Sequence, residues 1–318
     1  MHRLLPNLFF QSHINKLTCY KDVYVEFSLA RADYYEILNF AAMQLANVPG
    51  IQVETTTIES TFLERDVKVD VYLPLNVADS SQLSLLLIND GQDLPKMLFD
   101  EMLATLYAGD DAITPLLCVG IHCAPDRKME YGVAGHEDFL GRGANAGLFT
   151  LFVFKELLPF IRKTYAVSSF KEKAFAGFSL GGLMALDIVW NHPAEFSKVG
   201  VFSGSLWWRN IDQSDELYDD DKHRIIHQQI RNGSYFPWLK FFFQCGNMDE
   251  TKDRNNNGII DSIDDTLDLI KELEAKGYKE EKDIKYLEMK DGRHDVATWG
   301  RAMPAFLKWG WGIKQQAD

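Results

Sequence analysis

Two early stretches of the chain alternate apolar and polar residues, and short continuous apolar runs follow them. Residues 51–59 and 65–73 alternate with a period of two, which predicts the two antiparallel strands of a hairpin. The first of the later runs, 85–88, is apolar throughout, which is typical of a strand buried on both faces of a sheet. These runs predict strands at 85–88, 116–121, 173–176, 199–203, 239–244 and 284–289.

Between these strands, apolar residues recur at helical spacing. The spacing predicts helices at 97–107, 148–162, 180–190, 267–276 and 296–309. Strands that alternate with helices predict a mostly parallel sheet covered by helices on both faces. Residues 1–50 do not continue this pattern. We therefore expect an N-terminal extension of unknown role at 1–50 and one domain at 51–318.

Charge and composition narrow the possible partners. The chain has 318 residues and a formal net charge of −13, which argues against binding nucleic acid or an anionic membrane. No apolar run reaches transmembrane length, and the first residues lack a cleavable secretion signal. We expect a cytoplasmic protein, with a periplasmic location left open. The four cysteines are scattered and indicate neither a disulfide framework nor a zinc site.

A Gly-x-Ser-x-Gly sequence joins the strand at 173–176 to the helix at 180–190. Ser179 lies between Gly177 and Gly181, as in a strand-to-helix turn too tight for flanking side chains. Such a turn exposes a serine hydroxyl at the edge of a sheet, where a base can reach it. A glycine-rich turn without chemistry is the alternative interpretation.

A serine becomes a nucleophile when a histidine takes its proton and a carboxylate orients that histidine. In sheets of this type the order along the chain is Ser, then Asp or Glu, then His. Only His294 follows the serine and comes directly after a predicted strand. The acid is expected after the strand at 239–244, where Asp249 is favoured and Glu250 is the alternative. The backbone N–H groups of Leu180 and Gln92 are the expected oxyanion donors.

Several ordered motifs between about residues 57 and 309 resemble the "Putative esterase" family of α/β-hydrolases. The family includes enterochelin esterases, siderophore trilactone hydrolases, feruloyl esterases and S-formylglutathione hydrolase. The motifs are Asn89–Asp93, Arg127 with Glu130 and Tyr131, 156–161, Gly177–Gly182, Ser203–Trp208, Asp249 and Gly292–Asp295. The resemblance implies an α/β-hydrolase fold with Ser179, Asp249 and His294 as the catalytic triad. It also implies that Arg127, Trp207 and Trp208 contact the substrate, although core packing is the expected role of one of the two tryptophans.

The segment after Asp249 fits the template of a calcium-binding loop. Oxygen donors occur at positions 1, 3 and 5, glycine at 6, a backbone carbonyl at 7 and an acid at 12. The loop has asparagine instead of aspartate at positions 3 and 5, which reduces its negative charge. It has aspartate instead of glutamate at position 12, whose shorter side chain reaches less far toward an ion. The alternative is a plain turn whose Asp264 or Asp265 caps the next helix. The candidate ligands of a structural Ca²⁺ are Asp253, Asn255, Asn257, Ile259 and Asp264.

These features predict a serine hydrolase that cleaves small carboxylic esters through an acyl-enzyme and needs no cofactor for its chemistry. One alternative is an acyltransferase of the mycolyltransferase type, which passes the acyl group to an alcohol. The other is a calcium-responsive binding protein that has kept the scaffold without turnover. The sequence does not identify the ester or the oligomeric state.

Overall fold

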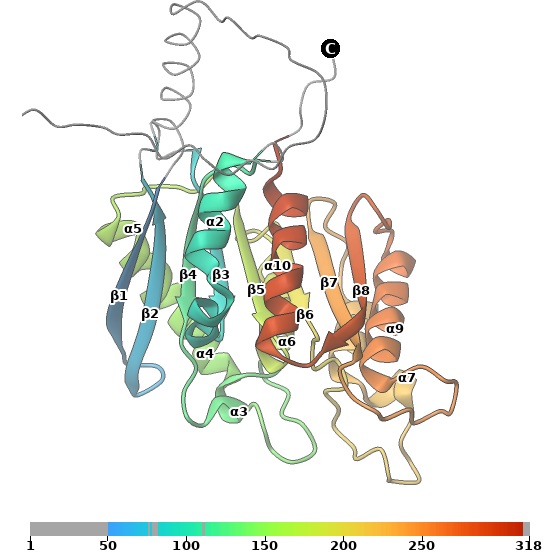
Figure 1. Ribbon diagram of the computed structural model, residues 1–318. Helices are drawn as coiled ribbons and strands as arrows, with labels where there is room; N and C mark the ends of the chain where they lie inside the picture. Colours follow the sequence, from blue (N-terminus) through green and yellow to red (C-terminus); the bar gives the residue numbers. More distant parts are fainter. Residues whose placement is uncertain (1–49, 76, 78–81, 110–111, 314–318) are drawn as a thin grey trace, which may run out of the picture. The chain divides into compact units, whose positions relative to one another are not determined.

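The computed structural model describes residues 50–75, 77, 82–109 and 112–313, and its core is one eight-stranded sheet (Figure 1). The strand order is β1-β2-β4-β3-β5-β6-β7-β8. β2 runs antiparallel to β1 and β4, and the remaining neighbours are parallel. The strands are β1 (Ile51–Ser60), β2 (Arg65–Pro74), β3 (Ser84–Asn89), β4 (Leu116–Ile121), β5 (Lys173–Phe178), β6 (Lys198–Phe202), β7 (Lys240–Met248) and β8 (Ile284–Arg293).

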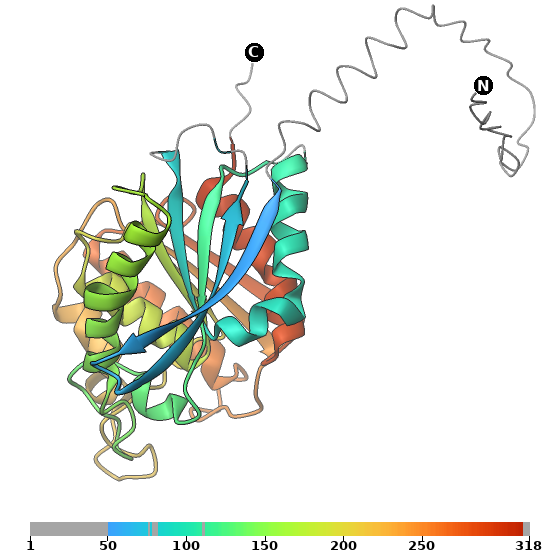
Figure 2. The same cartoon turned by 90° about the vertical axis from the view of Figure 1, so that its left-hand side faces the viewer.

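Helices cover both faces of this sheet, and Figure 2 shows the two helical layers on either side of it. The helices are η2 (Gly91–Met97), α2 (Phe99–Ala108), α3 (Arg127–Glu130), α4 (Ala146–Phe152), η3 (Val153–Leu157), α5 (Leu158–Thr164), α6 (Leu180–Asn191), α7 (Asp220–His223), α8 (Ile225–Asn232), α9 (Asp261–Lys276) and α10 (Val296–Trp311).

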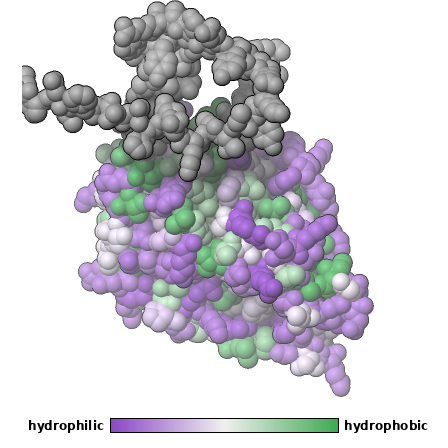
Figure 3. Space-filling model, viewed as in Figure 1, coloured by the Kyte–Doolittle hydropathy of each residue, from purple (hydrophilic) through white to green (hydrophobic). Residues whose placement is uncertain are grey.

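Alternate residues of the central strands supply two separate cores. Leu85 and Leu87 of β3 face the core that includes α4, α5, α6 and α9. Leu86 and Ile88 face the other core, with η2, α2 and α10. All four side chains are fully buried, which explains why this strand is a continuous apolar run. Figure 3 shows that the face over α2 and α10 is mainly hydrophilic outside, with apolar side chains in small groups.

The predicted fold class, a mostly parallel sheet with helices on both faces, is confirmed. The hairpin at 51–73 pairs as expected, with Ser60 opposite Arg65. One long helix was predicted at 148–162, but the segment divides into α4, a π-helical turn η3 and α5. α9 begins at Asp261, six residues earlier than predicted. Most side chains of its first turn are polar, so the apolar spacing did not indicate this start. The extension predicted at 1–50 lies outside the described residues, apart from Gly50.

Parallel strands bring their carboxyl ends to one edge of the sheet. β3, β5, β6, β7 and β8 all end at this edge, near the segments that carry α3 and α7 (Figure 1). The residues that follow these strands therefore meet there, whatever their separation along the chain. Among the described residues, no helix has the length and apolarity needed to cross a bilayer.

Candidate active site

Ser179 occupies a strained turn between β5 and α6. Its backbone angles, φ 55° and ψ −121°, belong to a region that residues with a side chain rarely adopt. The Ser179 N–H donates to the Phe202 carbonyl at 2.9 Å, and its carbonyl accepts from the Ser205 N–H at 3.1 Å. These bonds to the end of β6 and to the next loop hold the turn in place.

The two glycines around Ser179 are required by close backbone approach. A Cβ on Gly177 would lie 2.3 Å from the Gly181 carbonyl oxygen, and a Cβ on Gly181 would lie 2.4 Å from Asp90 Oδ2. Neither position has a flexible neighbour that could move away cheaply. The turn therefore accepts no side chain at residue 177 or 181.

We expect Gly177→Ala to lower the free energy of unfolding by about 3 kcal/mol, because the new methyl group meets backbone atoms. Urea unfolding followed by circular dichroism measures the loss. Gly147→Ala is the matched control, since nothing lies within 4 Å of its new Cβ and alanine favours helix α4. A Gly177→Ala protein as stable as the wild type would contradict the tight-turn interpretation.

Ser179 opens into a cavity of about 370 Å³ at the carboxyl edge of the sheet. The cavity collects residues from seven separate stretches of the chain. Leu180 also lines it, whereas Gln92 and Trp208 do not. The predicted side chains that line it are Arg127, Ser179, Trp207, Asp249 and His294.

The Ser179 hydroxyl already has a neighbour in this cavity. Its Oγ lies 3.2 Å from Oγ of Ser205, which follows β6. His294 lines the same cavity, but no hydrogen bond joins its ring to Ser179 or Asp249 among the described residues. Sequence reasoning singled out the Ser203–Trp208 motif, yet spacing could not show that Ser205 contacts the nucleophile candidate.

The His294 ring lies at the mouth of the cavity and packs edge-on against Trp299, with ring centroids 5.3 Å apart. Displacement of water from one side of the ring lowers the His294 pKa below its ordinary value of 6.5. The Asp249 carboxylate raises this pKa, and the Arg127 guanidinium lowers it. A neutral imidazole is therefore favoured near neutral pH.

The two acids considered after β7 differ in their surroundings. Asp249 accepts from the Gly246 N–H at 3.0 Å through Oδ2, while its Oδ1 is buried and has no partner within the described chain. Glu250 lines the cavity as well, and burial together with the Asp261 carboxylate raises its pKa. Of these two acids, only Asp249 contributes to the pKa of His294.

Arg127 connects the loop after β3 to the serine turn. It binds the buried Asp90 carboxylate through two hydrogen bonds of 2.6 and 2.7 Å. The same guanidinium donates to the Phe178 carbonyl at 2.9 Å, directly before Ser179. Gln92 side-chain atoms contact Cys123 instead of the cavity. Arg127 thus joins two segments in addition to lining the cavity.

The resemblance implied that Trp208 contacts the substrate, and the structure contradicts this because Trp208 does not line the cavity. Its side chain is fully buried, and it donates from Nε1 to the His136 carbonyl at 3.0 Å. The ring fills the space over Gly132 and Gly143, where an added Cβ would lie 2.8 Å from it. The Trp207 ring, whose centroid lies 5.9 Å from that of Trp208, lines the cavity. Of the two tryptophans, Trp208 is the one with the core role.

The residues of the calcium template converge in the loop between β7 and α9. Asp253 accepts from the backbone N–H groups of Asn257 and Gly258 at 3.1 and 2.9 Å. The Asn255 and Asn257 amides donate to Asp264 Oδ2 at 2.9 and 2.7 Å. No group of three or more His, Cys, Asp or Glu side chains suited to a metal occurs in the described part of the chain. The amide oxygens accept from backbone N–H groups, Asn255 Oδ1 from Asn257 at 3.1 Å and Asn257 Oδ1 from Ile259 at 2.8 Å. The two acids and two amides supply the donor atoms of a weakly charged calcium loop, but both amides must turn before their oxygens face an ion.

Solved structures of several esterases are similar to this chain. The enterochelin esterase from Shigella flexneri superimposes with a TM-score of 0.61 and 19% identity, over 82% of this chain and 59% of that one. An IroE-like serine hydrolase from Shewanella oneidensis gives a TM-score of 0.62 and 19% identity, over 81% and 79%. A ferulic acid esterase gives 0.58 and 18%, over 82% and 98%. These neighbours share the α/β-hydrolase fold.

Sequence comparison gives a curated relative and a family match. The uncharacterized protein YbbA of Bacillus subtilis is 24% identical over 147 residues, which are 44% of this chain and 57% of that protein. The chain thus spans less than two thirds of this relative and of the Shigella enzyme. The family model described as "Putative esterase" matches residues 60–309. Since this match covers most of the chain and includes every residue of the Ser179 cavity, the chain belongs to that esterase family.

Proposed function

We propose that the protein hydrolyses carboxylic esters with Ser179 as nucleophile, His294 as general base and Asp249 as the acid that orients His294. The observation that carries the proposal is that Ser179, on its strained turn, shares one cavity with His294 and Asp249. Membership of an esterase family supports the same activity.

In the first step His294 takes the Ser179 proton while Oγ bonds to the ester carbonyl carbon. The carbonyl π electrons move to the oxygen and form a tetrahedral oxyanion. When this species collapses, the bond to the alcohol oxygen breaks and His294 returns the proton to that oxygen. Water then attacks the acyl-enzyme with His294 again as base, which releases the acid and restores Ser179.

The orphan Oδ1 of Asp249 supports its role. A buried carboxylate oxygen without a donor is costly, and the ring N–H of His294 can supply that donor after a small movement. Catalytic hydrogen bonds are commonly longer in an empty site than in a substrate complex. An imidazolium formed during attack would be stabilised by the same carboxylate.

For the oxyanion, the proposed donors are the N–H groups of Leu180 and Gln92. Neither N–H donates to an acceptor within the described residues. Leu180 N is at the first turn of α6, where the unpaired N–H groups and the helix dipole favour negative charge. The Arg127 bonds to Asp90 and Phe178 fix the Gln92 loop relative to the serine turn.

A pH profile with p-nitrophenyl butyrate tests the activity. We expect hydrolysis whose kcat/KM falls on the acidic side with an apparent pKa below 6.5, because the base must be neutral and its pKa is lowered. Asp249→Asn removes the charge that raises this pKa and should move the acidic limb lower. Arg127→Gln removes a charge that lowers it and should move the limb higher. Absence of hydrolysis above the buffer rate would contradict the proposed function.

We also propose that the loop formed by residues 253–264 binds Ca²⁺ through Asp253, Asn255, Asn257, Asp264 and the Ile259 carbonyl. With only two carboxylates, a dissociation constant of about 10⁻⁴ to 10⁻³ M is expected. Ca²⁺ at 10 mM should raise the melting temperature by a few degrees in calorimetry, EGTA should reverse this, and Asp253→Asn should abolish it. Equal shifts with Mg²⁺, or a shift that survives Asp253→Asn, would contradict the site.

A further inference from the structure

A second cavity, of about 380 Å³, adjoins the one that contains Ser179. Arg142, Trp207 and Glu250 line both cavities, so the two share a wall. The second cavity contains none of the proposed catalytic side chains. Its position suits the part of a substrate that lies beyond the ester bond.

The shared wall is built around the Trp207 indole. The Arg142 guanidinium lies over this ring at 5.0 Å from its centroid, and the Arg209 guanidinium lies over it at 5.6 Å. Arg209 also lies over the Phe139 ring at 5.3 Å. Such contacts hold a guanidinium in one plane and leave its N–H edge for a ligand.

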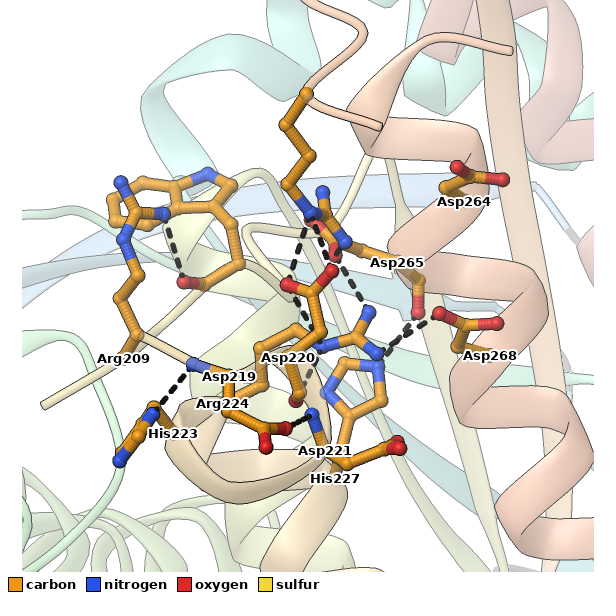
Figure 4. A network of polar contacts seen from close by, with 12 residues as sticks. Arg209, Asp219, Asp220, Asp221, His223, Arg224, His227, Asp264, Asp265 and Asp268 are labelled. Atoms are coloured by element: carbon orange, nitrogen blue, oxygen red, sulfur yellow. Dashed lines mark hydrogen bonds and ion pairs between the residues drawn. The ribbon is translucent and has the colours of Figure 1, made fainter. Parts of the chain in front are cut away.

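Two of the four cations that line the second cavity already have counter-ions. Arg142 binds Asp138 through its Nε and Nη2. Arg254 binds Asp220, Asp261 and Asp265. Figure 4 shows the part of this network around Asp220 and Asp265, where Asp265 also binds the buried Arg224 at 2.8 Å. The guanidinium groups of Arg142 and Arg254 are therefore already paired with carboxylates of the protein.

Arg209 differs from Arg142 and Arg254 in its lack of a counter-ion among the described residues. In Figure 4 it lies apart from the Asp220, Asp265 and Asp268 carboxylates, and none of the described acids forms an ion pair with it. Its Nη1 donates to the Trp207 carbonyl at 3.3 Å, its Nε is buried without an acceptor, and its Nη2 has no described acceptor. A half-buried guanidinium with one weak bond is poorly compensated, which favours an anion beside it.

The other charged residues of the second cavity do not neutralise the Arg209 guanidinium. Lys252, at the exposed margin, forms no ion pair with a described residue. The Asp212 carboxylate accepts from the Ser214 N–H and hydroxyl, and it forms no ion pair with Arg209 or Lys252, although both cations lower its pKa. Glu250 is the other acid of the shared wall. Burial and the Asp261 carboxylate raise its pKa, which disfavours its negative charge.

We propose that the second cavity binds a carboxylate carried by the substrate, with Arg209 as its main contact and Lys252 as a second one. This inference rests on the proposed ester hydrolysis and names the substrate class, an ester whose acyl part ends in a carboxylate several atoms from the scissile carbonyl. Trp207 would pack against the chain between the two groups. A carboxylate matches the planar N–H edge of arginine better than a neutral group does.

Matched substrates test this inference. Mono-p-nitrophenyl esters of adipic, pimelic and suberic acid are compared with the same esters whose distal carboxyl is methylated. For at least one chain length we expect kcat/KM for the acid to exceed that for its methyl ester about tenfold, and Arg209→Gln should remove this ratio through KM. Lys155→Gln, an exposed change on η3, is the control that keeps the ratio.

Binding provides a readout that does not depend on turnover. Calorimetric titration of Ser179→Ala with each ester should give tighter binding of the acid than of the methyl ester, and Ser179→Ala combined with Arg209→Gln should bind both alike. Equal binding of acid and methyl ester at every chain length, or a preference that survives Arg209→Gln, would overturn the inference. Absence of hydrolysis with a retained carboxylate preference would instead reject the proposed catalysis alone.

Discussion

Replacement of Ser179 by alanine should lower kcat for p-nitrophenyl butyrate by at least about 10⁴-fold. The variant loses the only oxygen proposed to bond to the acyl carbon, and the oxyanion donors alone stabilise a much slower attack by water. Burst-phase stopped-flow kinetics add a second readout, since no acyl-enzyme can form without Oγ. The wild type should also be labelled at Ser179 by a fluorophosphonate probe.

The fold of this variant should be intact, because the strained turn is held by backbone bonds to Phe202 and Ser205. Its melting temperature should match that of Ser168→Ala, an exposed serine change that serves as the control. Activity of Ser179→Ala near the wild-type rate would reject the nucleophile. Loss of activity with a collapsed melting curve would attribute the loss to folding and leave fluorophosphonate labelling of the wild type as the test of the nucleophile.

Replacement of Asp249 by asparagine should lower kcat by about 10³- to 10⁴-fold. Asparagine keeps the size of the side chain but removes the charge that stabilises an imidazolium at His294. Its amide can also face the ring with a donor, which would select the wrong tautomer. KM should change little, because the proposed role of the acid is to orient the histidine and not to bind the substrate.

Glu250→Gln provides the comparison, since Glu250 lines the same cavity and is the alternative acid. We expect kcat of this variant to fall by less than tenfold. A larger loss for Glu250→Gln than for Asp249→Asn would exchange the two roles. The expected order follows from the pKa of His294, to which the Asp249 charge contributes and that of Glu250 does not.

The sequence was sufficient for the sheet and for the segments that carry the site. Continuous apolar runs such as 116–121 coincide with β4, because a strand buried on both faces tolerates no polar position. The turn at Ser179 was predictable because a turn this tight has no space for side chains on either side of the serine, and glycines stand at both positions. His294 was predictable from chain order, since parallel strands bring successive loops to one edge of the sheet.

Contacts between loops could not be predicted in this way. Adjacent tryptophans at 207 and 208 look alike in sequence, and only the approach of Gly132 and Gly143 determines which one is buried. The contact of Ser205 with Ser179 and the isolation of Arg209 also depend on how separate loops fold together. Apolar periodicity carries no information on these points. The early start of α9 was missed for a related reason, because its first turn is polar and buried through ion pairs.

The arginine–aspartate network of Figure 4 restricts how this protein can be engineered. Arg224 and Arg254 come from different loops but share Asp265, so replacing either one leaves the buried Asp265 carboxylate with a single arginine. Weakening the compensation of a buried charge destabilises the folded state. Libraries that aim to broaden the range of accepted esters should leave this cluster unchanged. Arg209 and Lys252, which take no part in it, are the permissive positions at which directed evolution can reshape the second cavity.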